Sequence, residues 1–252
     1  RIRRFSDVIE EIESFLRERL SNKTVESYMS DIRMFLSRMH EISVDDMRRF
    51  VEGARSAARR NNRAKAMKWL ARFFGFEFNY RFEPVEAGLI YAPPREAVRE
   101  FISKLDGRYK TYAKLLVATG IRPEALTRLK PEDLDVRRGV LRVSRLSNRT
   151  KRYRDNPIPP ELIPDVLEML ERGVTKNGWR KAVERAVRRG APRISREELR
   201  NFFYSEATRF VPENVVRWLM GHRLGTAEHY FATRKAGEIR RYWAEISDIL
   251  SL

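Results

Sequence analysis

The sequence contains no cysteine and only three histidines, which are His40, His222 and His229. Without cysteine, neither a disulfide bond nor a thiolate metal site can form. Three histidines are too few for a histidine-rich metal centre. We therefore expect a protein that works without a metal and without another cofactor.

Long hydrophobic runs are also missing. No window approaches the roughly 18 uninterrupted apolar residues of a membrane-spanning helix, so we expect no membrane association through a span. The opening residues, RIRRFSDVIEEIESF, have no apolar signal-peptide core. The hydrophobic fraction of 42% in 252 residues is nevertheless enough for one large domain or two ordinary ones.

Acidic residues are scarce relative to basic ones. The chain has 52 Lys and Arg against 35 Asp and Glu, which gives a formal net charge of +17. Cations that neutralise phosphates release counterions, and this release drives binding to nucleic acid. An acidic membrane surface or an acidic protein could also attract such a chain. The membrane alternative is the weakest, because no amphipathic stretch stands alone as an anchor.

Helical periodicity runs through residues 1–80. Apolar residues recur every three or four positions in FSDVIEEIESFLRERL and SNKTVESYMSDIRMFLSRM, and two further stretches complete about four helices. The opposite faces carry many arginines, such as Arg55, Arg59, Arg60 and Arg63. Such a face is either merely solvated or turned toward DNA, and the pattern favours neither.

Proline and glycine then interrupt the helical pattern. Pro84, Gly88, Pro93 and Pro94 all fall within a short stretch. Because both residue types break helices, we expect a linker over 81–93. This linker would separate a domain at 1–80 from a second domain at 94–252.

The middle of the second domain changes character. The segments DLDV and GVLRVSR are short and rich in branched apolar residues, and RRG separates them. They predict strands of a small antiparallel sheet, with RTKRYRDNPIPP as the returning strand. Helical periodicity resumes at ELIPDVLEMLERG and continues to the end of the sequence. The expected fold class is therefore mainly α with a small antiparallel β-sheet.

Two arginines stand in unusual settings. In ATGIRPEALTRL, Gly120 ends a helix and Arg122 follows the turn, at a helix start that favours anions. Arg200 lies among apolar residues in EELRNFFYSEA, where an arginine needs a partner or a bound anion. A salt bridge and a phosphate both satisfy that need for Arg200.

A histidine and a tyrosine follow in WLMGHRLGTAEHYF. His222 comes directly after Gly221, and Tyr230 lies eight residues further on, at the predicted start of a new helix. Taken alone, the pair fits a surface histidine and a core tyrosine. A shared site is the alternative.

These motifs together resemble the tyrosine recombinases, the phage-integrase or Xer-type family. That family has an arginine in a T-G-x-R-x-x-E-L box, a lysine on a β-hairpin, an H-x-x-R box, and a G-H shortly before a nucleophilic tyrosine. The sequence has TGIRPEAL, LRNFFYS, LMGH and TAEHYF in the same order. SNKTVESYMSDIRMFL also resembles the family's helical core-binding domain, so the likeness spans nearly the whole chain. The divergent boxes are closer to integrases of archaeal viruses or plasmids than to bacterial Xer proteins.

The resemblance implies a core-binding, DNA-binding domain at 1–80 and a catalytic domain at 94–252. Lys151, the single lysine between Lys130 and Lys176, falls at the family's hairpin position when counted back from NPIP. Counting forward from GVLRV does not place it there. The neighbouring arginines at 149 and 152 are the alternatives.

Two positions depart from the family pattern. Glu197 stands three residues before Arg200, where the family usually has histidine. A carboxylate there repels a substrate phosphate unless it is paired or protonated, yet Glu197 remains a candidate member of the site. The acid of the first box is displaced to Glu124, with Ala125 in its place, so support of Arg122 by that acid is in doubt.

The resemblance also implies a mechanism. Tyr230 would attack the scissile DNA phosphate and form a 3′-phosphotyrosyl bond, which releases a 5′-hydroxyl. Arg122 and Arg200 would neutralise the non-bridging oxygens, and Lys151 would protonate the leaving oxygen. His222 would hydrogen-bond the phosphate. The covalent link conserves bond energy, so neither ATP nor a metal is needed.

The implied partners are double-stranded DNA attachment sites and further copies of the chain, as a dimer or tetramer on DNA. The implied location is the cytoplasm, at the nucleoid of an archaeal or bacterial host. Two alternatives remain: a type IB topoisomerase, which shares the tyrosine chemistry, and a non-catalytic DNA-binding relative. The tail KAGEIRRYWAEISDILSL either packs on its own domain or docks on a neighbouring protomer.

Overall fold

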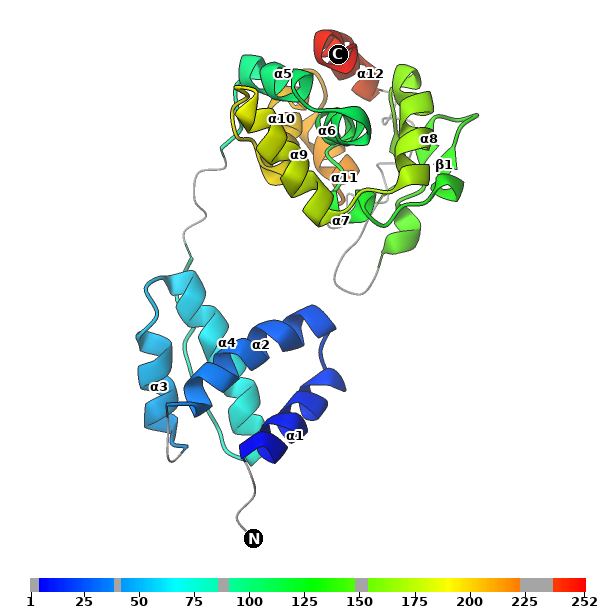
Figure 1. The fold of residues 1–252 in the computed structure, drawn as a ribbon. Helices are drawn as coiled ribbons and strands as arrows, with labels where there is room; N and C mark the ends of the chain where they lie inside the picture. Colours follow the sequence, from blue (N-terminus) through cyan, green and yellow to red (C-terminus); the bar gives the residue numbers. More distant parts are fainter. Residues whose placement is uncertain (1–4, 39–41, 86–90, 148–153, 223–237) are drawn as a thin grey trace. The chain divides into compact units, whose positions relative to one another are not determined.

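The computed structural model describes residues 5–38, 42–85, 91–147, 154–222 and 238–252. The chain forms two compact units, residues 1–88 and residues 89–252, which we call unit 1 and unit 2. Each is described by itself below (Figure 1). The predicted fold class, mainly α with a small antiparallel sheet, is confirmed. The assignment of the units as core-binding and catalytic domains stays a prediction.

The described part of unit 1 contains four helices, three of which begin after a capping serine. They are α1 (Phe5–Arg17), α2 (Asn22–Leu36), α3 (Val44–Glu52) and α4 (Ala57–Phe74). Ser21, Ser43 and Ser56 precede α2, α3 and α4, and each side chain accepts a hydrogen bond from a backbone N–H of the first turn. Such caps satisfy donors that a helix start leaves open. Gly75 ends α4 with a left-handed φ of 79°.

The predicted apolar stripes form the core of unit 1. The side chains of Ile12, Leu16, Ile32 and Phe35 are wholly buried there. Residues of α2 and α3 pack against α4, which is the longest helix of the unit. The apolar stripes predicted for α1 and α2 therefore contain the residues that these two helices bury.

The arginine-rich faces of unit 1 are largely engaged within the unit. Arg59 makes an ion pair of 2.5 Å with the wholly buried carboxylate of Asp31. Arg60 pairs with Glu83 at 2.5 Å. Arg63 donates to the Phe50 carbonyl and lies over that residue's ring. A structural role thus accounts for three of the four arginines, and Arg55 alone among them is exposed and makes none of these contacts.

Unit 2 is built around α6 (Gly107–Thr119), in which ten of thirteen residues are buried. A helix that is apolar on nearly all sides needs neighbours all around it. The neighbours are α5 (Arg95–Ser103), α8 (Ile163–Arg172) and α10 (Arg196–Ala207). Figure 1 shows α6 between α8 on one side and α10 on the other. The helix α9 (Lys176–Arg188) completes this layer and packs Trp179 against Phe101 and Tyr112.

A three-stranded antiparallel sheet lies beside these helices. Its strands, in spatial order, are β1 (Leu134–Asp135), β2 (Val140–Leu141) and β3 (Asn156–Pro157). Leu134 pairs with Leu141, and Leu141 pairs with Asn156. Pro157 occupies an edge strand, where its missing N–H breaks no ladder. Three short 3-10 helices, Pro131–Asp133, Ser144–Leu146 and Pro160–Leu162, join the strands to their neighbours.

The C-terminal tail packs on its own unit. It forms α12 (Ile239–Glu245) and α13 (Ser247–Leu250). The Tyr242 hydroxyl donates to the Val117 carbonyl at 2.5 Å, and the Trp243 indole donates to the Ala118 carbonyl at 2.8 Å. Both side chains are buried, and burial raises the pKa of Tyr242 well above its usual value. Of the two alternatives for the tail, the structure therefore shows the first.

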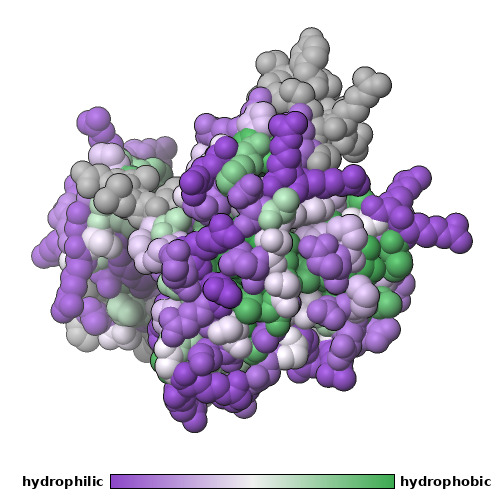
Figure 2. Space-filling view, turned by 90° about the horizontal axis from the view of Figure 1, so that it is seen from above, coloured by the Kyte–Doolittle hydropathy of each residue, from purple (hydrophilic) through white to green (hydrophobic). Residues whose placement is uncertain are grey.

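The face of the molecule drawn in Figure 2 is mostly polar. Hydrophilic side chains cover most of the face drawn in Figure 2, with apolar side chains gathered between them. Along the described residues, no helix combines the length and the apolar character that crossing a membrane requires.

Candidate active site

Three successive carbonyls at the end of α11 (Glu213–Leu219) organise the candidate site. A helix end leaves its last carbonyls without intrahelical partners and carries a partial negative charge. The carbonyl of Leu219 accepts from the Asn156 amide at 3.2 Å. The next two, of Met220 and Gly221, accept from Arg200 at 2.8 Å and Arg122 at 3.3 Å. Side chains from three distant parts of the chain thus meet at one helix end.

Arg122 reaches this point from the turn between two helices. Gly120 ends α6 with a φ of 60°, and Arg122 is the N-cap of α7 (Pro123–Leu126), whose first residue is proline as predicted. The side chain is half-buried and lines a small cavity together with Arg154 and Gly221. The backbone turn therefore sets the direction of this guanidinium.

Arg200 projects from α10 toward the same place. Its Nε donates to the Gly120 carbonyl at 2.7 Å, and its Nη2 donates to the Met220 carbonyl and lies 3.4 Å from His222 Nε2. Neutral backbone carbonyls are thus among the partners of Arg200. Because carbonyls carry no net charge, these contacts orient the guanidinium without cancelling its positive charge.

His222 completes the cluster. Its backbone N–H donates to the Arg217 carbonyl at 3.0 Å, and Gly221, with a φ of 73°, makes the preceding turn. Partial burial lowers the pKa of the His222 imidazole, and the positive charges of Arg200, Arg122 and Arg217 lower it further. The lowered pKa favours the neutral imidazole, which can donate one hydrogen bond.

Two guanidiniums and an imidazole lie close together here, and groups of this kind are suited to binding an anion with several oxygens. Arginine provides planar pairs of N–H donors that match phosphate oxygens. The three side chains belong to residues 122, 200 and 222, which the sequence motifs had singled out. In the described ranges, no three His, Asp or Glu side chains cluster in a way that could hold a metal ion.

The remaining candidates are placed differently. Glu197 lies one turn before Arg200 on α10, and its side chain is 62% exposed, 4.0 Å from Arg196. Glu124 is exposed on α7, and Arg122 donates to the Gly221 carbonyl. Lys151 and Tyr230 lie outside the described residues, so their roles stay predictions.

Two features of the site were missed from the sequence. One is Asn156, which is 2% exposed and joins β3 to the end of α11. The other is the close packing of Phe203 on Gly120: a Cβ placed on this glycine would lie 2.2 Å from Phe203 Cδ1. Only the conformation of the turn could have revealed the second, because glycine commonly ends helices for other reasons.

Gly120→Ala should destabilise unit 2 by about 2–5 kcal/mol, through left-handed strain and overpacking against Phe203. The matched control is Gly75→Ala. Gly75 also ends a helix at positive φ, but no atom lies within 4 Å of the position that an alanine Cβ would take there. Urea unfolding followed by circular dichroism measures both. An equal, small loss of free energy of unfolding in the two variants would contradict the packing argument.

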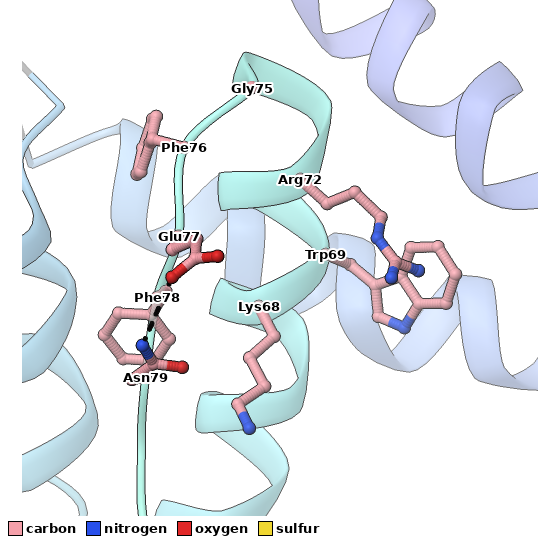
Figure 3. A pocket seen from close by; sticks show the side chains of 8 residues that line it. All are labelled: Lys68, Trp69, Arg72, Gly75, Phe76, Glu77, Phe78 and Asn79. Carbon is pink, nitrogen blue, oxygen red and sulfur yellow. Dashed lines mark hydrogen bonds between the residues drawn. The ribbon is translucent and has the colours of Figure 1, made fainter.

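Unit 1 has a separate cavity of about 550 Å³ along α4 (Figure 3). Lys68, Trp69 and Arg72 line it from the helix, and residues 75–79 line it from the following segment. The Arg72 guanidinium lies 5.1 Å from the centre of the Trp69 ring. Aromatic rings between cations are typical of surfaces that bind nucleic acid.

No protein-family model matches the sequence, and no curated protein matches it. Solved structures do match. A lambda integrase dimer bound to a COC′ core site is 16% identical, with 94% of this chain and 77% of that chain covered at a TM-score of 0.62.

The Tn1549 transposon integrase in complex with circular intermediate DNA is also 16% identical, with 95% of this chain and 98% of that chain covered at a TM-score of 0.58. At such low identity the likeness concerns the fold. It covers nearly all of this chain and agrees with the fold class that the resemblance to tyrosine recombinases predicted. The chain therefore has the integrase fold.

Proposed function

We propose that the protein is a site-specific DNA recombinase of the tyrosine type, an integrase that cuts and rejoins DNA through a 3′-phosphotyrosyl intermediate. The observation that carries this proposal is the convergence of Arg122, Arg200 and His222 at the end of α11. A phosphodiester has two non-bridging oxygens, and two guanidiniums can hold both. The integrase fold and the net charge of +17 support DNA as the substrate.

In this mechanism the two arginines stabilise the charge that develops on the phosphate during attack. Neutral His222 donates a hydrogen bond to a phosphate oxygen. Tyr230 is the nucleophile, and its phenol loses its proton as the bond to phosphorus forms. Lys151 gives a proton to the departing 5′-oxygen. The 5′-hydroxyl of a partner strand then attacks the phosphotyrosine and releases the enzyme.

The proposed partners are double-stranded DNA attachment sites and further copies of the chain. Similar structures include a lambda integrase dimer bound to a COC′ core site and a lambda integrase tetramer bound to a Holliday junction. Strand exchange between two sites requires a copy of the active site at each cut, which favours a dimer or tetramer on DNA. Glu197, exposed beside Arg196, is the weakest member of the proposed site.

The test is formation of a covalent protein–DNA adduct. Duplexes that the protein binds are first selected from a random-sequence pool. They are then rebuilt with a nick at successive positions, so that the short strand carrying the 5′-hydroxyl dissociates after cleavage and traps the adduct. We expect an adduct that survives denaturing electrophoresis and forms in EDTA without ATP. Tight binding without any adduct would refute the catalytic proposal.

A paired-site assay separates recombination from topoisomerase activity. We expect exchange of strands between two plasmids that carry the selected site. Relaxation of any supercoiled plasmid, without exchange, would instead identify a topoisomerase.

Lys68→Gln with Arg72→Gln should weaken DNA binding and reduce the salt dependence of log K by about 2, because each lost phosphate contact lowers the slope by about 1. Fluorescence anisotropy at several salt concentrations measures the slope. The control, Arg180→Gln with Lys181→Gln, removes the same charge from exposed positions on α9. Equal slopes for the two double variants would show that the cavity along α4 does not contact DNA.

A further inference from the structure

Asn156 is a buried polar residue at the junction of the sheet and α11. It lies on β3, paired with Leu141, and only 2% of its surface is exposed. Its Nδ2 donates to the carbonyls of Leu219 and Arg154, at 3.2 and 2.9 Å. Both neighbours are acceptors, so the amide nitrogen must face them.

The Leu219 carbonyl precedes the two carbonyls that hold the arginines. Met220 and Gly221 follow it directly, and their oxygens accept from Arg200 and Arg122. Successive peptide groups are rigid planes that share one Cα atom. Fixing the Leu219 carbonyl therefore restrains the orientation of the next two, on which both guanidiniums depend.

Stability alone does not explain this asparagine. Its Oδ1 is buried and accepts no hydrogen bond in the part of the chain that the structure describes. A buried acceptor without a donor costs about 1–3 kcal/mol of stability. This cost offsets part of the stabilisation that the two hydrogen bonds donated by Asn156 contribute. The same side chain lines the small cavity beside Arg122 and Gly221.

We infer that Asn156 is a positioning residue for DNA cleavage: it holds the end of α11 so that Arg122 and Arg200 point at the same phosphate. The inference rests on the proposed function. Asn156 acts through the Leu219 carbonyl and touches no substrate atom. Its removal should slow the chemical step and leave DNA affinity nearly unchanged, because distant cationic contacts supply most of the binding.

The experiment uses Asn156→Leu, which keeps the volume and removes the donors. With the nicked duplexes described above at saturating concentration, the single-turnover rate of adduct formation should fall about 10- to 100-fold, since small displacements of catalytic groups have effects of that order. The dissociation constant should change by less than about 3-fold. If this variant does not fold, Asn156→Ser, whose hydroxyl can donate one bond, is measured instead and should retain an intermediate rate.

Asn61→Ala is the matched control. Asn61 is a nearly buried asparagine of unit 1 that exchanges two hydrogen bonds with the Glu83 backbone. It should lower the melting temperature yet leave the rate of the bound enzyme unchanged. A wild-type rate for Asn156→Leu would overturn the positioning role while the proposed function stands. Absence of any adduct from the wild-type protein would instead refute the proposed function.

Discussion

Tyr230→Phe should abolish covalent attachment to DNA and leave duplex binding within about 3-fold of wild type. Phenylalanine keeps the ring but lacks the oxygen that attacks phosphorus in the proposed mechanism. Tyr230 is chosen because it matches the tyrosine of the recombinase motif, eight residues after His222. The structure places His222 itself beside both arginines. Denaturing electrophoresis of the nicked-duplex reaction measures the adduct, and anisotropy measures binding.

Tyr204→Phe is the control for this prediction. Tyr204 is a partly exposed tyrosine of α10 whose hydroxyl donates to Glu213 at 2.6 Å, and this hydrogen bond raises the pKa of the phenol. Tyr204→Phe also removes one tyrosine hydroxyl oxygen from unit 2, but the protein–DNA adduct should still form. Loss of the adduct in Tyr204→Phe and its persistence in Tyr230→Phe would show that Tyr230 is not the nucleophile.

Arg200→Ala should slow adduct formation by about 10³-fold, or about 4 kcal/mol of activation free energy, at saturating DNA. The guanidinium is held by the carbonyls of Gly120 and Met220, so it is already oriented before the substrate arrives. A preoriented charge stabilises the transition state without reorganisation. The effect should therefore appear in the single-turnover rate and only weakly in the dissociation constant.

Arg200→Lys separates charge from geometry. Lysine keeps the charge but cannot donate to both carbonyls and a phosphate from one rigid plane, so the rate should still fall about 10²-fold. Arg209→Ala serves as the control. Arg209 lies two residues after the end of α10, its side chain is 65% exposed, and it makes an ion pair with Glu206. An Arg200→Ala rate equal to that of Arg209→Ala would remove Arg200 from the mechanism.

The helices and the motif residues were accessible from the sequence. Apolar spacing identified α1 to α4, and branched residues on either side of RRG indicated β1 and β2. Order and spacing of the boxes selected Arg122, Arg200 and His222, which the structure brings together. Each of these predictions depends on a local pattern of side-chain types, and whether the three residues act in catalysis stays a prediction.

Features that depend on distant partners were not accessible. Arg59 and Arg60 look like a solvated or DNA-facing surface because Asp31 lies on another helix and Glu83 lies beyond α4. Asn156, directly before Pro157, is typical of a turn. Its role emerges only when β3 lies against α11, which no local pattern specifies.

Both guanidiniums donate hydrogen bonds to main-chain oxygens, and this has an evolutionary consequence. Every amino acid supplies the same main-chain carbonyl oxygen. Leu219 and Met220 can therefore be exchanged for other apolar residues without removing the acceptors to which Asn156 and Arg200 donate. Selection then preserves the path of the backbone and tolerates amino-acid substitutions along it. An architecture shared with integrases at 16% identity is what such freedom allows.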